Sequence, residues 1–359
     1  MRLLRFFLSF ALAALVAVTP AHSQTADAST DHLYVCNQGA ATISVIDMAT
    51  NEIVDTINLQ DLGFSANAKP HHAIAEPDGS AWYVTLIGEN RVLKFDAQNE
   101  LVAQAELEVP GLLAMHPSKD WLLVGRSMSA VNPPSSIAAV RRSDMTVQEE
   151  ISTFFPRPHA LATTPDGAYA YVASLAENQL MAISMNDAES TNLTRLGGPT
   201  QVFVQFAISP NGNTMVATGQ ISGQVVVFDT SDPENPTVTD TIAVNAEPWH
   251  PIYSPDGKHV YFGNKRAHTV TVLNMESREV EAVIEGEGLA QPHGTALSPD
   301  GTYLYVSNNN RQGTYQPPQG SSATNPPGTI TVINTETHEI EKIIPVGAYP
   351  SGIGTRARW

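Results

Sequence analysis

The sequence predicts an all-β fold, a ring of seven four-stranded sheets of the β-propeller type. Three observations predict it: a tight-turn motif recurs at a regular period, short β-type runs fill the intervals, and no stretch forms an amphipathic helix of three turns. The period matches a four-stranded propeller blade and exceeds the repeat of most helical solenoids. The motif is Pro-Asp-Gly or a close variant, and its prolines stand at positions 77, 117, 165, 210, 255 and 299.

Each repeat is expected to contain four strands. The first is apolar and leads into the turn, where proline presets φ and glycine accepts a positive φ. The second is aromatic and β-branched, and the third alternates with period two. Examples of the four strands, in order, are residues 71–75, 303–306, 329–334 and 339–346.

The two ends of the chain are expected to complete the ring. The first repeat, from His32, enters at its second strand and lacks an innermost one. Residues 350–356 repeat the proline-then-apolar opening of the other repeats, so we expect them to supply that strand. Closure inside one blade removes an exposed sheet edge and gives seven blades. A single propeller domain over 32–359, with a long loop at 308–328, then follows a flexible tail at 24–31.

Composition supports a packed domain and argues against polyanionic partners. The 359 residues are 42% hydrophobic and 15% charged, which suffices for a large core and excludes a disordered chain. Acidic residues number 36 against 19 basic ones, a net charge of −17. Nucleic acids and anionic membranes attract the opposite sign, so we expect no nucleic-acid partner.

Residues 1–23 predict an export signal. Arginines give it a positive start, residues 6–18 form an apolar run too short to span a bilayer, and a small-x-small cleavage site ends at Ser23. We therefore expect cleavage near Ser23, a periplasmic or secreted protein, and no membrane insertion. The single cysteine, Cys36, has no partner for an intrachain disulfide.

Two pairs of strands carry a family resemblance. Residues 34–37 read Tyr-Val-Cys-Asn before the strand at 42–47, and residues 305–308 read Tyr-Val-Ser-Asn before the strand at 329–334. These pairs resemble the YVTN-type β-propeller repeat, and the resemblance covers nearly all of the mature chain. It implies the propeller fold, whereas the functions of that family range from binding and surface proteins to subunits of redox enzymes.

Aligning the repeats on their turn prolines places histidines at equivalent positions. A second proline lies seven residues earlier in five of six repeats, and the two positions after it open the innermost strand at the mouth of the central channel. Neutral imidazole is a common ligand of copper and zinc, so these positions predict a site for a metal ion or small ligand. Five of the eleven histidines occupy them: His71, His72, His159, His250 and His293.

A structural lining of the channel around ordered water is the alternative interpretation of these histidines. Because side chains alternate along a regular strand, His71 and His72 should point to opposite faces. Long loops are often functional, and two enlarged loops, at 126–134 and 308–328, are expected on the same face, where they could cover the mouth or bind a protein partner. Further contributors to the rim are predicted at Glu247, Trp249, Gln205, Arg126, Arg311 and Tyr315.

The histidine positions also resemble those in the propeller domain of nitrous oxide reductase. That family holds its copper cluster with histidines at blade starts, including an adjacent pair, so the resemblance implies a metal-binding rim. The present chain departs from the pattern, because the repeats with Gly111 and Val204 at these positions contribute no histidine. It also has no room for the cupredoxin domain, so the reaction is not implied.

Three classes of function follow. The leading one is an exported binding protein that holds copper or zinc at the histidines, rather than an enzyme. The second is a metal-assisted hydrolase of the lactonase type or a subunit of a periplasmic redox enzyme, and the third is a protein-interaction scaffold. No Gly-x-Ser-x-Gly, His-Glu-x-x-His, Cys-x-x-Cys or glycine-rich phosphate loop occurs, so no catalytic residue is assigned.

Overall fold

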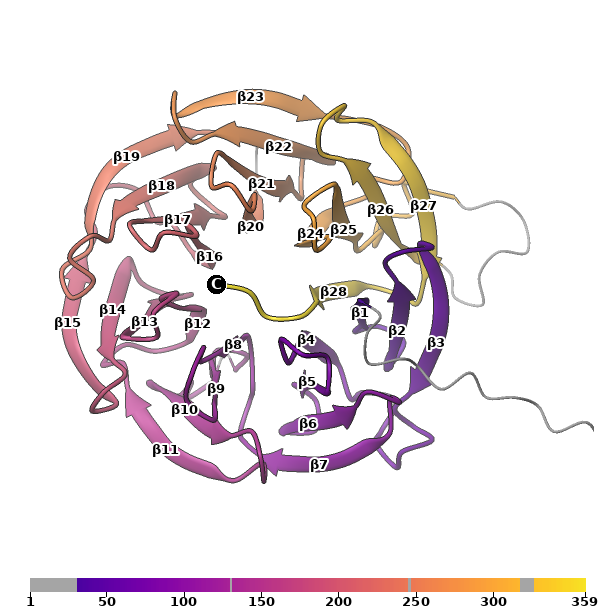
Figure 1. Ribbon diagram of the computed structural model, residues 1–359, viewed down its shortest axis with the longest axis horizontal. Helices are drawn as coiled ribbons and strands as arrows, with labels where there is room; N and C mark the ends of the chain where they lie inside the picture. The colour runs from indigo at the N-terminus through magenta and orange to yellow at the C-terminus, as the bar shows by residue number, and fades with distance from the viewer. Residues whose placement is uncertain (1–30, 130, 245–246, 317–325) are drawn as a thin grey trace, which may run out of the picture.

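Seven four-stranded antiparallel sheets surround a central axis in the computed structural model (Figure 1). The structure describes residues 31–129, 131–244, 247–316 and 326–359. The predicted seven-bladed β-propeller is therefore confirmed. The predicted export signal, nearly all of the tail at 24–31 and the middle of the loop at 308–328 lie outside the described residues.

Blades are numbered from the N-terminus, and each contributes its strands in order from the axis outward. Blade 1 contains β28 (Pro350–Gly354), β1 (His32–Asn37), β2 (Thr42–Asp47) and β3 (Glu52–Asn58). Blade 2 contains β4 (Pro70–Ala75), β5 (Ala81–Leu86), β6 (Arg91–Asp96) and β7 (Leu101–Glu106). Blade 3 contains β8 (Leu113–Met115), β9 (Trp121–Val124), β10 (Ser136–Arg141) and β11 (Val147–Ser152).

The remaining four blades follow the same plan. Blade 4 contains β12 (Pro158–Thr163), β13 (Tyr169–Ser174), β14 (Gln179–Ser184) and β15 (Glu189–Arg195). Blade 5 contains β16 (Phe203–Ile208), β17 (Thr214–Gly219), β18 (Gln224–Asp229) and β19 (Thr237–Ala243). Blade 6 contains β20 (Pro248–Tyr253), β21 (His259–Asn264), β22 (Thr269–Asn274) and β23 (Glu279–Ile284), and blade 7 contains β24 (Pro292–Leu297), β25 (Tyr303–Asn308), β26 (Gly328–Asn334) and β27 (Ile340–Val346).

The ring closes in blade 1, as the sequence predicts. Strand β28 pairs with β1 in antiparallel fashion, with Val35 opposite Ile353. The closing strand is shorter than the predicted 350–356, because it ends at Gly354 and the chain then turns along β4 toward the axis (Figure 1). There the backbone N–H of Ala357 donates to the carbonyl of Ala75 at 2.8 Å.

The Pro-Asp-Gly turns join the first and second strands of their blades. In blade 6, Gly257 has a φ of 73°, a conformation that glycine adopts without steric cost. The Oδ1 atom of Asp256 accepts the N–H of Lys258 at 3.1 Å and the hydroxyl of Ser254 at 2.6 Å. These side-chain bonds explain why the motif recurs with so little change.

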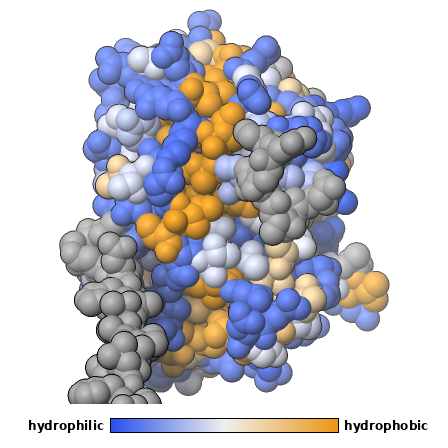
Figure 2. Space-filling model, turned by 90° about the vertical axis from the view of Figure 1, so that its right-hand side faces the viewer, coloured by the Kyte–Doolittle hydropathy of each residue, from blue (hydrophilic) through white to orange (hydrophobic). Residues whose placement is uncertain are grey.

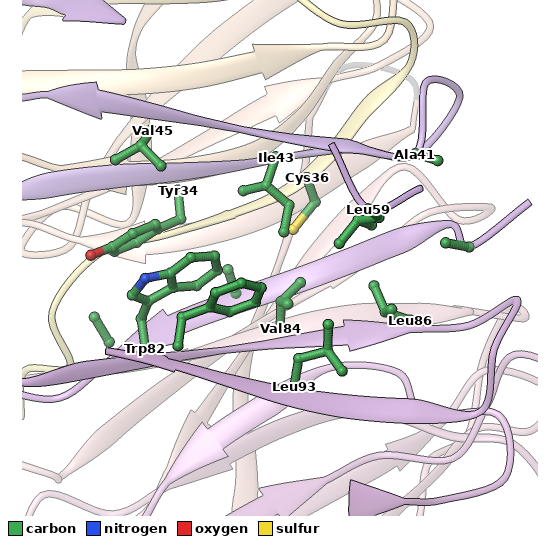
Figure 3. Close-up of a cluster of buried hydrophobic side chains, with 14 residues drawn as sticks. Tyr34, Cys36, Ala41, Ile43, Val45, Leu59, Trp82, Val84, Leu86 and Leu93 are labelled. Atoms are coloured by element: carbon green, nitrogen blue, oxygen red, sulfur yellow. The ribbon is translucent and has the colours of Figure 1, made fainter. Parts of the chain in front are cut away.

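Apolar layers between neighbouring blades form the core. Between blades 1 and 2, the rings of Tyr34, Trp82 and Phe95 stack with centroids 4.3 and 4.2 Å apart (Figure 3). Cys36 lies fully buried in the same layer, among Ile43 and other aliphatic side chains. Side chains on the facing sides of adjacent sheets thus bury one another all around the ring.

The outer surface carries polar side chains interrupted by apolar ones. Figure 2 shows an apolar band on the side of the ring that faces the viewer. Ile53 and Val54 of the outermost strand β3 are 38% and 52% exposed. Within the part of the chain that the structure describes, no helix has the length and apolar character needed to cross a membrane.

Candidate functional site

A β-bulge at the start of the innermost strand places the histidines. In blade 2, Pro70 pairs with Leu86 and Ala73 with Val84, so two residues, His71 and His72, oppose the single residue Thr85. Blades 6 and 7 have the same irregularity, with register shifts after Pro248 and Pro292. A bulge interrupts the alternation of side chains along a strand.

The expectation that His71 and His72 face opposite sides therefore does not apply to this strand. It assumed a regular strand, and the bulge removes that assumption. The hydroxyl of Thr85 accepts the N–H of His72 at 3.2 Å. The side chain opposite the bulge thus provides the hydrogen-bond acceptor for the displaced backbone N–H. Ser307 does the same for Gly294 in blade 7, at 2.9 Å.

Imidazoles from blades 2, 4, 6 and 7 converge at the end of the ring where the innermost strands begin, which we call the start end. The centroids of His71 and His159 lie 6.0 Å apart, and those of His250 and His293 lie 5.1 Å apart. The ring of His72 lies 6.3 Å from that of His250. Four of the five side chains are buried, with exposed fractions of 4 to 6%, and His72 is half-buried.

Several ring nitrogens in this cluster lack partners. Both ring nitrogens of His71, and the Nδ1 atoms of His159 and His293, have no hydrogen-bond partner among the residues that the structure describes. The Nδ1 atom of His72, in contrast, accepts the N–H of Leu113 at 3.3 Å, so its neutral ring carries the proton on Nε2. Buried polar atoms are nearly always paired, so these nitrogens are suited to hold a ligand or ordered water.

Burial keeps the cluster neutral. It lowers the pKa of His71 to about 4 and that of His159 to about 3, with further lowering by Lys265 and His71, respectively. Burial and the neighbouring His71 lower the pKa of His72 to about 3, and burial holds the pKa values of His250 and His293 well below 6.5. Neutral imidazole is the form that ligates metal ions.

A cationic and aromatic rim adjoins the cluster. The indole of Trp249 lies 4.8 Å from the ring of His293, and the Nζ atom of Lys265 lies 4.2 Å from the centre of that indole. The guanidinium of Arg311 lies 5.2 Å from the ring of Tyr349, and Lys265 lies 5.9 Å from the same ring. Glu247 accepts the N–H of Lys265 through its backbone carbonyl at 2.9 Å.

Lys265 and Tyr349 are absent from the sequence-based prediction. Lys265 lies in the turn after β21, and Tyr349 directly precedes the proline of the closing strand. Both positions follow from the repeat, since second-to-third turns and pre-proline residues share the start end with the histidines. Their residue types, however, differ from blade to blade.

The other predicted rim residues have different roles. The Oε1 atom of Gln205 accepts the N–H groups of Leu161 at 3.0 Å and Phe206 at 2.9 Å, which links blades 4 and 5. The guanidinium of Arg126 bonds to Ser136, Glu108 and Glu150. Tyr315 is buried where its backbone bonds to Asn310. The length of a loop alone does not show which partners these side chains bond to.

Backbone strain is repeated at the start end. In six blades the residue directly before the innermost strand has a left-handed φ, and in blade 3 Val109, four residues before β8, has one as well; none of the seven is glycine. Left-handed backbone costs about 1 to 2 kcal/mol for such residues and is typical of ligand-binding segments. The residues are Lys69, Val109, Arg157, Val202, Glu247, Gln291 and Tyr349, with φ between 45° and 63°.

The opposite end, where the Pro-Asp-Gly turns lie, is apolar. A cavity of about 440 Å³ is lined there by prolines of four turns and by aliphatic side chains such as Ile208 and Leu297. Residues 355–359 also line it, and a guanidinium nitrogen of Arg358 donates to the carbonyl of Ser298 at 3.3 Å. We call this the turn end.

Among the described histidine, cysteine and acidic side chains, no three lie in positions where they could together hold a metal ion. Two imidazoles that share one ion have ring centroids about 5 to 6 Å apart, because a metal–nitrogen bond is about 2.0 Å long. The observed separations of 5.1 and 6.0 Å fall in that range. Each of these two pairs therefore has the spacing of two imidazoles bound to one ion.

The sequence matches no protein-family model. Solved structures share the fold at low identity. A functionally unknown protein from Desulfotomaculum acetoxidans is 17% identical with a TM-score of 0.73, covering 92% of this chain and 100% of the other. The periplasmic gluconolactonase of Pseudomonas aeruginosa is 17% identical with a TM-score of 0.70 (92% and 99%), and hydrazine synthase of Kuenenia stuttgartiensis is 20% identical with a TM-score of 0.65 (80% and 89%). The chain is thus a seven-bladed β-propeller, similar in fold to a gluconolactonase and to hydrazine synthase.

Proposed function

We propose that this protein is an exported YVTN-type binding propeller whose start end holds one copper or zinc ion. The orphaned ring nitrogens of His71, His159 and His293 carry the proposal. Each buried polar atom without a partner costs about 1 to 3 kcal/mol, and a shared ion would remove that cost for several of them at once.

The chemistry of the donor set suits a borderline or soft cation. His71, His159, His250 and His293 would hold the ion, which would supply Lewis acidity or, for copper, one-electron chemistry. His72 would orient the cluster instead, since its Nδ1 atom is already bonded to the backbone of Leu113. Neutral imidazoles release no proton on binding, so binding should persist well below pH 7.

A similar fold at 17 to 20% identity does not show that two proteins catalyse the same reaction. The hydrolase and redox-subunit alternatives therefore rest on the sequence alone. The proposed export rests on residues 1–23, and a periplasmic or secreted location would give access to copper and zinc. The resemblance to the nitrous oxide reductase propeller supports the position of the site. It does not extend to that reaction.

Metal analysis of protein prepared without an affinity tag tests the proposal. After loading with copper or zinc and removal of excess, we expect one ion per chain. The double variant His159→Ala, His293→Ala should weaken binding by more than about tenfold. His259→Ala is the matched control, because His259 pairs with Glu281 at 3.1 Å on the outer part of blade 6. Substoichiometric metal that the double variant leaves unchanged would refute the proposal.

A further inference from the structure

Two cations without counterions flank the aromatic side chains of the start end. Lys265 lies over Trp249, and Arg311 lies over Tyr349, with Lys265 also near that second ring. No carboxylate of the described residues lies within ion-pair distance of either cation. The carboxylate of Glu247 acts on Lys265 only from a greater distance.

The chain has 36 acidic and 19 basic residues, so carboxylates outnumber cations. Other half-buried basic side chains in the ring bond either to carboxylates or to backbone carbonyls, as Lys94 does to Arg142 and Arg157 does to Ser127. Arg126 bonds to Glu108 and Glu150, and Arg142 bonds to Glu76. Lys265 and Arg311 differ from these side chains because, among the described residues, they contact aromatic rings and bond to neither a carboxylate nor a carbonyl.

Lys265 is also partly removed from water. Burial lowers the pKa of Lys265 to about 8, and Arg311 lowers it further while Glu247 opposes the effect. The ammonium remains mainly protonated at pH 7. Its closeness to a second cation is unfavourable without an anion, so the arrangement favours binding of one.

Hydrogen bonds of the fold hold the backbone at Lys265 and next to Arg311. The backbone N–H of Lys265 bonds to Glu247. Arg311 follows Asn310, whose buried Nδ2 atom donates to the carbonyls of Tyr315 at 2.9 Å and Pro327 at 2.8 Å. These bonds hold the backbone at the base of the loop, from which the exposed side chain of Arg311 extends to Tyr349.

We infer that Lys265 and Arg311, which lie over the rings of Trp249 and Tyr349, bind a small oxyanion at the start end. The chemistry fits a carboxylate or an inorganic oxyanion, because ammonium and guanidinium groups donate charge-assisted hydrogen bonds to either. Trp249 contacts His293, so the bound anion would lie next to the histidine cluster. The inference does not depend on metal binding.

Calorimetric titration of chelator-treated protein with malonate and, separately, with sulfate tests the inference at low ionic strength. We expect saturable binding of at least one probe, weakened by added NaCl. Lys265→Met should weaken it by about tenfold or more and Arg311→Met by a smaller factor, because Lys265 is the less solvated cation. Lys265→Arg should retain binding. Lys258→Met is the matched control, since Lys258 is exposed on the turn end beside Asp256.

Binding of malonate alone would identify the source as a carboxylate, and binding of sulfate alone would identify an inorganic oxyanion. Both results support the site. Absence of saturable binding by either probe, or equal weakening in Lys258→Met and Lys265→Met, would overturn the inference. Thermal unfolding of each variant separates loss of binding from loss of fold, and metal content measured on the same proteins tests the metal proposal separately.

Discussion

The start end and the turn end of the ring are built from the same seven repeats, yet their chemistry differs. The turn end repeats Pro-Asp-Gly with little change, and its prolines form an apolar mouth lined also by residues 355–359. The start end varies from blade to blade and gathers histidines, two unpaired cations and strained backbone. The constant end maintains the fold, and the variable end is where binding is expected.

Acid should destabilise the protein through the start end, and this is the largest effect that we expect. The pKa of His71 is about 4 when folded and 6.5 when unfolded, so the unfolded chain takes up protons first as pH falls. The contribution of His71 to the free energy of unfolding is therefore present in full above pH 6.5. It is lost as the pH falls to about 4, and the loss is about 3 kcal/mol for His71 alone.

Urea unfolding of metal-free protein between pH 7 and pH 4.5 measures this loss. The variant His71→Asn, His159→Asn should flatten the profile, whereas His259→Asn should leave it steep. If the wild type and the double variant had parallel profiles, the buried histidines would not be neutral as described.

Removal of residues 355–359 should affect only the turn end. Truncation after Gly354 deletes the bonds of Thr355 and Ala357 to the backbone of Ala75 and the ion pair of Arg356 with Asp31. We expect a loss of about 2 to 3 kcal/mol in unfolding free energy. Metal and anion binding should be unchanged, as measured by metal analysis and calorimetry. A loss of binding that exceeds the loss of fold would show that the two ends are coupled.

Substitutions that remove or introduce glycine should change the free energy of unfolding in opposite directions at the two ends. Gly301→Ala should destabilise the turn end by about 1 to 2 kcal/mol, because φ is 75° and an added Cβ atom would lie 2.8 Å from Pro255. Val109→Gly should stabilise by up to about 1 kcal/mol, because it relieves a β-branched residue at a φ of 45°. Thermal unfolding of both variants compares them directly, and destabilisation by Val109→Gly would contradict the strain assigned to the start end.

The period of the turn motif was enough to predict the ring, its closure by residues near 350 and the convergence of the repeats on one axis. The bulge at His71 and His72 was not predicted, because an apolar strand start reads as regular alternation. The hydroxyl of Thr85 opposite the bulge is the physical signal that could have indicated it.

The residues of the rim were harder to predict than those of the cluster. Lys265 and Tyr349 lie beside the histidines because of tertiary placement of turns whose residue types do not repeat. Arg126 and Gln205 are engaged by Glu150 and by the backbone of Leu161, interactions that single-sequence spacing does not contain.

X-ray absorption spectroscopy of the loaded protein tests the central proposal most directly. If imidazoles from separate blades share the ion, the spectrum should contain at least three imidazole nitrogens at about 2.0 Å. A first shell of oxygen alone, or a spectrum unchanged by the substitution of His159 and His293, would contradict it.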